Sequence, residues 1–132
     1  MKLHGGRQYA FNWISGIRLM AGCDGSVNQA LNDIEAIDSW TAPAHRTGWT
    51  QHKVLLDGGV ERPIFHQSAG KIGTKKTCSL FFIQEADTAY VIAVAKHSGP
   101  TTYDTVWTRD SFADFPTTID VAAKQPLTVV QR

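Results

Sequence analysis

The sequence predicts an α+β fold, with two N-terminal helices packed on a small antiparallel β-sheet. Apolar residues recur at steps of three and four in residues 8–39, whereas short runs of β-forming residues dominate residues 49–97. Pro43 and Gly48 separate the two patterns, because neither residue continues a helix well. No internal repeat, low-complexity tract or long linker divides the chain, so we expect a single domain over residues 1–132.

The two helices are predicted from their apolar stripes. Helix one is expected over residues 8–21, with Gly22 at the point where a helix would stop. Helix two is expected over residues 27–39, because Ser26 followed by Gln29 three residues later is typical of a capping box. The acidic residues of helix two lie off its apolar stripe, as on a solvated face, and we give them no catalytic role: Asp33, Glu35 and Asp38.

The sheet is predicted from alternating and continuous apolar runs. We expect its strands over residues 49–56, 60–66, 75–84 and 89–96. Asp57-Gly58-Gly59 has the composition of a hairpin turn, and Pro63 should keep the second strand at an edge. The last of the four strands is almost wholly apolar, so we place it at the centre of the sheet.

The pattern is weaker after Pro100. Short helices over residues 101–109 and 117–124, and a closing strand over residues 127–130, are the elements that we expect there. They would form a small C-terminal unit packed on the sheet.

Charge and hydropathy exclude several classes of protein. The chain has 13 Lys and Arg against 12 Asp and Glu, a formal net charge of +1. A charged partner would therefore have to bind a local charged patch on the surface. The longest apolar stretch, residues 90–95, is far shorter than the roughly 20 residues that a membrane-spanning helix needs. Because Met1 begins no signal-peptide pattern, we expect a cytoplasmic protein, or an effector domain delivered to the cytoplasm of a target cell.

The cysteines and histidines predict neither a disulfide framework nor a metal site. Two cysteines, Cys23 and Cys78, are too few for a disulfide scaffold and lack the paired spacing of zinc ligands. His45 and His52 are seven residues apart, and the other histidines are isolated in the sequence. We therefore expect no metal and no cofactor.

The candidate chemistry lies at the end of the expected central strand. Alternation places His97 on one face with Val91, Ala93 and Ala95, and Lys96 on the other with Tyr90, Ile92 and Val94. Imidazole is the side chain whose ordinary pKa allows proton transfer near neutral pH, so His97 is a candidate general acid or base. The alternative interpretation is a solvent-facing strand end that only terminates the sheet.

One segment is clearly basic. Residues 62–76 contain no acidic residue and four cations: Arg62, Lys71, Lys75 and Lys76. If the strands pair antiparallel as expected, Lys75 and Lys76 come close to the end at which Lys96 and His97 emerge. Cations beside a general acid or base suit phosphodiester cleavage, because they offset charge on the phosphorane. The alternative is a solvated basic loop.

Residues 90–97, Tyr-Val-Ile-Ala-Val-Ala-Lys-His, followed six residues later by Tyr103, resemble the last core strand and active-site tail of the RelE/ParE-like toxin superfamily. The order of elements is similar too, and the resemblance covers residues 49–103 in pattern and the two helices in order. For the RNA-cleaving branch, it implies a metal-independent ribonuclease, often acting on mRNA in the ribosomal A site and held inactive by an antitoxin. ParE-like members do not cleave RNA, so the fold alone does not fix the activity.

The resemblance also implies roles for individual residues. His97 takes the acid/base position, Lys96 and Lys76 hold the scissile phosphate, and Tyr103 stacks on a base or assists proton transfer. Thr77 stands where the family carries an arginine, so Lys76 replaces it without the bidentate grip of a guanidinium. The basic residues expected to contact RNA are Arg62, Lys71 and Lys75.

The leading hypothesis is therefore a toxin-type endoribonuclease that uses a 2′-hydroxyl as its nucleophile. Its expected partners are RNA, including mRNA on the ribosome, and an antitoxin or immunity protein, with no membrane partner. A second enzyme class starts from Cys23, which precedes helix two as in Cys/His hydrolases of the NlpC/P60 kind.

A third class is a non-enzymatic binding module. Two helices followed by a sheet also suit an NTF2-like fold, whose curved sheet encloses an apolar pocket; aromatic residues available to line it are Trp40, Trp49, Phe65, Phe81 and Phe82. An immunity or adaptor module that binds a partner through the edge strand near Pro63 is a further form of this class. A closed apolar cavity would favour binding, whereas a shallow basic cleft containing His97 would favour the nuclease.

Overall fold

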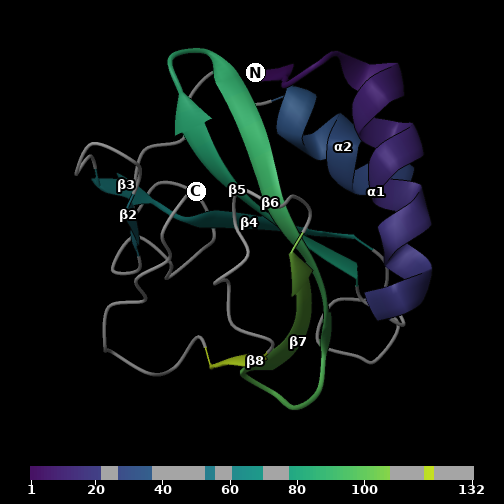
Figure 1. The fold of residues 1–132 in the computed structure, drawn as a ribbon. Helices are drawn as coiled ribbons and strands as arrows, with labels where there is room; N and C mark the ends of the chain where they lie inside the picture. Colours follow the sequence, from purple (N-terminus) through teal and green to yellow (C-terminus); the bar gives the residue numbers. More distant parts are fainter. Residues whose placement is uncertain (22–26, 37–52, 56–60, 70–77, 108–117, 121–132) are drawn as a thin grey trace.

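The computed structural model describes residues 1–21, 27–36, 53–55, 61–69, 78–107 and 118–120 (Figure 1). Its elements are, in chain order, β1 (Lys2–Leu3), α1 (Arg7–Ala21), α2 (Val27–Glu35), β2 (Lys53–Leu55), β3 (Glu61–Pro63), β4 (Phe65–Ala69), β5 (Cys78–Glu85), β6 (Thr88–His97), β7 (Thr102–Trp107) and β8 (Thr118–Asp120). Within these residues, two helices pack against a mainly antiparallel sheet. The α+β class predicted from the sequence is confirmed.

β6 is the central strand of the main sheet, as expected for residues 89–96. The strand order is β4-β5-β6-β7-β8, and β5 pairs antiparallel with β6 along nearly all of its length. On the opposite edge of β6, β1 pairs in parallel with the first residues and β7 pairs antiparallel with the last five. β2 and β3 form a separate two-stranded hairpin, which agrees with the turn predicted at residues 57–59.

α1 and α2 lie side by side on one face of the main sheet, which we call the helix face (Figure 1). The 3.6-residue period of the helices and the two-residue period of the strands bring their apolar side chains into one buried cluster. Its members include Ala10, Ile14, Val27, Ala30, Leu31, Ile34, Phe65, Leu80, Phe82, Val91 and Val94. Full burial of each larger side chain stabilises the fold by roughly 1.5–3 kcal/mol.

The opposite face of the sheet carries a second buried cluster, and we call it the concave face. Its members are Ile64, Phe81, Ile83, Ile92, Ala93, Ala95, Tyr103 and Ile119. The ring of Tyr103 on β7 lies 5.8 Å from the ring of His66 on β4, although two strands separate β7 from β4 in the sheet. A flat sheet would hold β4 and β7 about 14 Å apart, so the sheet curls around this face.

A β-bulge at Ile92 interrupts the alternation of β6. Phe81 pairs with Ala93, but the next residue of β5, Phe82, pairs with Val91, so Ile92 is an extra residue on β6. Before the bulge, Val91 contributes to the helix face; after it, Ala93 and Ala95 contribute to the concave face. The expectation that His97 shares a face with Val91 is therefore wrong, because uniform alternation does not pass through a bulge.

The segment after Pro100 also differs from the prediction. The short helix expected over residues 101–109 is wrong, because β7 pairs with β6 there, and the helix expected over residues 117–124 is wrong at 118–120, where β8 pairs with β7. The β-branched and aromatic residues of β7 suit a strand with an alternating buried side, and Tyr103 and Thr105 are its buried members. The closing strand expected over residues 127–130 lies outside the described residues.

The second strand predicted over residues 60–66 is two strands. β3 ends at Pro63, which has no N–H to donate, and Phe65 begins β4 in the main sheet. Residues 37–52 and 70–77 lie outside the described residues. The expected end of helix two, including Asp38, therefore stays a prediction. The same holds for the expected start of a strand at residue 75.

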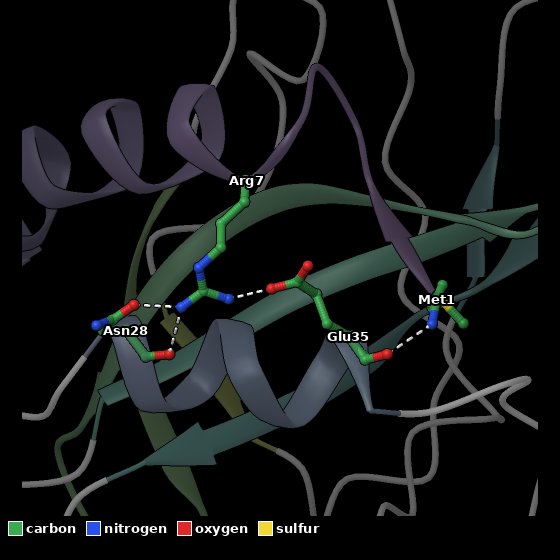
Figure 2. A network of polar contacts seen from close by, with 4 residues as sticks. All are labelled: Met1, Arg7, Asn28 and Glu35. Carbon is green, nitrogen blue, oxygen red and sulfur yellow. Dashed lines mark hydrogen bonds and ion pairs between the residues drawn. The ribbon is translucent and has the colours of Figure 1, made fainter.

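A polar network joins Met1 and Arg7, the first residue of α1, to both ends of α2 (Figure 2). The guanidinium of Arg7 donates to the Glu35 carboxylate and to the side-chain and main-chain oxygens of Asn28. The amino group of Met1 donates to the main-chain carbonyl of Glu35 over 2.9 Å. Asp33 accepts a hydrogen bond of 3.2 Å from the buried amide of Gln67 on β4. Glu35 and Asp33 thus hold α2 in place.

The β5–β6 turn carries an exposed ion pair with a defined pH dependence. Asp87 lies 3.2 Å from the amine of Lys2, and this hydrogen-bonded contact, helped by the Thr88 hydroxyl, lowers the pKa of the Asp87 carboxyl. Because the folded-state pKa is lowered, the stabilisation is present above the unfolded value near 3.9 and is lost as the pH falls through the folded value.

We therefore expect Lys2→Met to raise the pKa of Asp87 and to reduce the loss of stability below about pH 4. A ¹³C NMR titration of the Asp87 carboxyl measures the first effect directly. Lys96→Met, at the other end of β6, is the matched control and should leave the pKa of Asp87 unchanged. An Asp87 titration that is the same in Lys2→Met and in the wild type would contradict the assignment.

Candidate functional site

The candidate site lies where β6 turns into β7. His97 is the last residue of β6 and pairs with Tyr103, and their rings pack with centroids 4.2 Å apart. The turn between the strands is closed by two hydrogen bonds from Ser98 to Thr102, one from the main chain over 3.0 Å and one from the hydroxyl over 3.1 Å. Strand pairing thus holds the imidazole and the phenol together, with 9% of His97 and 4% of Tyr103 exposed.

A main-chain contact sets the tautomer of His97. Its Nδ1 lies 3.1 Å from the carbonyl oxygen of Gly99. A carbonyl oxygen only accepts, so Nδ1 carries the proton in this hydrogen bond and the neutral ring has its lone pair on Nε2. A side chain at position 99 would meet the Thr102 hydroxyl at 2.6 Å, which explains a glycine at this close approach. The turn therefore presents His97 with Nε2 available as a base.

Tyr103 also contacts a second imidazole. Its ring packs edge-on against Phe81 with centroids 5.5 Å apart and lies 5.8 Å from His66, so two histidines contact one phenol. The sequence did not predict this position of His66. Alternation along β4 is the signal that places His66 on the face opposite Phe65 and Gln67, but its approach to Tyr103 depends on the curl of the sheet.

Lys96 is separated from this cluster. It is consecutive with His97 in β6 and so points to the opposite face, as the sequence predicts. Its register partners are Asp104 on β7 and Cys78 on β5, and the facing carboxylate of Asp104 is an opposite charge across the strands. The structure thus brings together His97 and Tyr103 and leaves Lys96 on the helix side.

The basic segment is described only in part. Arg62 lies in β3, opposite Val54 in the separate hairpin, whereas Lys71, Lys75 and Lys76 lie outside the described residues. β5 begins at Cys78, which pairs with Lys96, so the expected antiparallel pairing of these two strands is confirmed. The contacts of these four cations with phosphate or RNA stay predictions.

Comparisons with protein-family models, curated proteins and solved structures found no match. The resemblance to RelE/ParE-like toxins therefore stays a prediction from the sequence. Among the described residues, no group of three or more His, Cys, Asp or Glu side chains is placed to hold a metal ion. The same part of the chain contains no helix with the length and hydropathy needed to cross a membrane.

A shallow apolar cleft lies elsewhere, between α1 and the start of β6. It is lined by Leu3, His4, Tyr9, Ala10, Trp13, Ile14, Ala89 and Val91, and neither His97 nor Lys96 is among them. The aromatic residues expected to line an NTF2-like pocket do not share one surface. Phe65 and Phe82 belong to the helix face and Phe81 to the concave face, while Trp40, Trp49 and Cys23 lie outside the described residues.

Proposed function

We propose that the protein is a metal-independent endoribonuclease of the toxin type, with His97 as its general base. The observation that carries the proposal is the contact of His97 Nδ1 with the Gly99 carbonyl, which leaves Nε2 to accept a proton. The contact with Tyr103 fixes the plane of the same imidazole. A neutral, oriented imidazole at the end of a rigid strand suits proton abstraction near neutral pH.

The reaction is a transphosphorylation within the RNA. His97 Nε2 takes the proton of a 2′-hydroxyl, the 2′-oxygen forms a bond to phosphorus, and the bond from phosphorus to the 5′-oxygen breaks. The 5′-oxygen takes up a proton from a general acid or from water as it leaves, so the products are a 2′,3′-cyclic phosphate and a 5′-hydroxyl end. Tyr103 contacts His97 and assists the proton transfer; its ring is 4% exposed and packed against neighbouring rings, so the expected stacking on a base does not suit this position.

Charge on the phosphorane needs a nearby cation. Because Lys96 points to the helix face, we assign this contact to Lys76, with Arg62, Lys71 and Lys75 along the RNA backbone. The resemblance to RelE-like toxins supports these assignments, and it also supports ribosome-bound mRNA as the substrate, an antitoxin as a partner and the cytoplasm as the site of action.

The proposal predicts that His97→Ala loses RNA cleavage by about 10²–10⁴-fold, which is the usual contribution of a general acid or base. Purified mRNA is incubated with the protein in EDTA, and a second arm adds the protein to a translating cell-free extract with magnesium. Primer extension maps the cuts in both arms. Cuts in EDTA identify metal-independent cleavage. Cuts confined to the extract, and absent from purified mRNA in magnesium without EDTA, identify a requirement for the ribosome.

The matched control is His4→Ala, which removes an exposed imidazole near the other end of β6 and should leave the cuts unchanged. Equal cleavage by His97→Ala and the wild type would contradict the mechanism. Intact mRNA in every reaction would instead support the second candidate, a non-enzymatic binding module. The observation that favours this candidate is the apolar cleft, at whose rim Tyr9 is 45% exposed.

A further inference from the structure

We propose that His66 is a second catalytic residue, the general acid that protonates the leaving 5′-oxygen. This inference rests on the proposed ribonuclease function and assigns a role that the sequence did not indicate. The observation behind it is that His66 on β4 and His97 on β6 both pack against the ring of Tyr103.

The curl of the sheet creates this arrangement. β5 lies between β4 and β6. His66 on β4 pairs with Phe81 on β5, and Phe81 pairs with Ala93 on β6, which is four residues before His97. Tyr103 spans the separation from the β7 side, with its ring 5.8 Å from His66 and 4.2 Å from His97. The ring centroid of Phe81 lies 5.5 Å from that of His66 and 5.5 Å from that of Tyr103, so one apolar ring packs against both side chains.

The chemistry of the reaction calls for two such groups. In an in-line displacement the entering and leaving oxygens lie on opposite sides of phosphorus, so one imidazole cannot serve both at once. An alkoxide leaving group needs a proton, and amines and phenols, with reference pKa values near 10, give one up poorly at neutral pH. Imidazole, with a reference pKa near 6.5, is suited to either role. Among the described residues, His66 is the imidazole that shares Tyr103 with His97.

Two protons are transferred in this step, one to the enzyme and one from it. His97 Nε2 accepts the proton of the 2′-hydroxyl as the bond from the 2′-oxygen to phosphorus forms. The bond from phosphorus to the 5′-oxygen breaks, and the imidazolium of His66 gives its proton to that oxygen. The enzyme is left with a neutral His66 and a protonated His97, and exchange with water restores the starting state.

Two substrates distinguish the general acid from the general base, because only one of them has a leaving group that needs a proton. The first is a uridine–adenosine dinucleotide, whose 5′-alkoxide needs protonation; the second is the p-nitrophenyl ester of uridine 3′-phosphate, whose phenolate leaves without a proton. We expect His66→Ala to lower kcat/KM about 10²–10⁴-fold on the dinucleotide and less than about tenfold on the aryl ester. His97→Ala should lower kcat/KM on both substrates, and His4→Ala on neither.

The ratio of the two kcat/KM values within one variant does not depend on how much of that variant is folded, because both rates scale with the same active enzyme. A ratio in His66→Ala equal to that of the wild type would overturn the role of His66 while the ribonuclease function stands. A wild type that cleaves neither these substrates nor mRNA in the translating extract would overturn the proposed function itself, and the role of His66 with it. If the wild type cuts only in the extract, cuts by His66→Ala equal to those of the wild type would overturn the role of His66.

Discussion

Alanine at Phe81 or at Phe82 should lower the free energy of unfolding by about 3–5 kcal/mol in each case, yet with different consequences for the candidate site. Both side chains are fully buried, so each replacement removes a large apolar group and leaves a cavity. The two residues are neighbours in β5 and point to opposite faces. Phe82 contacts Phe65 beneath the helices, whereas Phe81 contacts His66 and Tyr103 on the concave face.

Urea unfolding followed by circular dichroism measures the loss of stability, and NMR of the aromatic rings separates the two faces. Phe81→Ala should shift the ring signals of His66 and Tyr103, and Phe82→Ala should shift those of Phe65. Each variant is thus the control for the other. A loss below about 1 kcal/mol in either variant, or equal shifts of the His66 ring in both, would contradict the assignment of the faces.

Deletion of Ile92 should lower the free energy of unfolding by about 2–5 kcal/mol and leave the two faces of β6 unchanged. Without the extra residue, Ala93 becomes the neighbour of Val91, and regular alternation still places Ala93 and His97 on the concave face and Lys96 on the helix face. Ile92 is fully buried in the cluster of the concave face, so the expected cost is that of removing one large apolar side chain from the core.

Urea unfolding measures the loss of stability, and NMR contacts between the rings of His97 and Tyr103 report the faces of β6. Ile92→Ala is the matched control, because it removes most of the same side chain, keeps the extra residue and should cost a similar amount. A deletion variant that does not fold, or that loses the contact between His97 and Tyr103 while Ile92→Ala keeps it, would show that β6 needs the bulge to place its side chains.

Local patterns predicted much of the fold. The helical stripe of α2 and the apolar run of β6 are signals within a few residues of one another, and both are matched by the structure. The turn predicted at residues 57–59 lies outside the described residues, but the strands on either side of it pair antiparallel, as a hairpin requires. β1 was missed because two residues carry no periodicity, and its pairing with β6 joins distant parts of the chain. β7 was mistaken for a helix because its identity comes from pairing with β6, and local propensity is weak there.

The candidate site was predictable to a smaller extent. A short turn between β6 and β7 brings Tyr103 opposite His97, and both residues were singled out from the sequence. Simple alternation also separated Lys96 from His97. The bulge at Ile92 and the curl that brings His66 to Tyr103 are collective properties of a paired sheet, so no single segment of sequence encodes them.

The parallel pairing of β1 with β6 also has a consequence for biosynthesis. Lys2 pairs with Thr88, which follows it by 86 residues, so β1 cannot make this pairing until the central strand has been made. At about 5–20 residues per second, translation takes roughly 4–17 seconds to cover that interval. Contacts of such long sequence separation form slowly and late in folding. We therefore expect β1 to dock on the nascent protein only after the β5–β6 hairpin has formed.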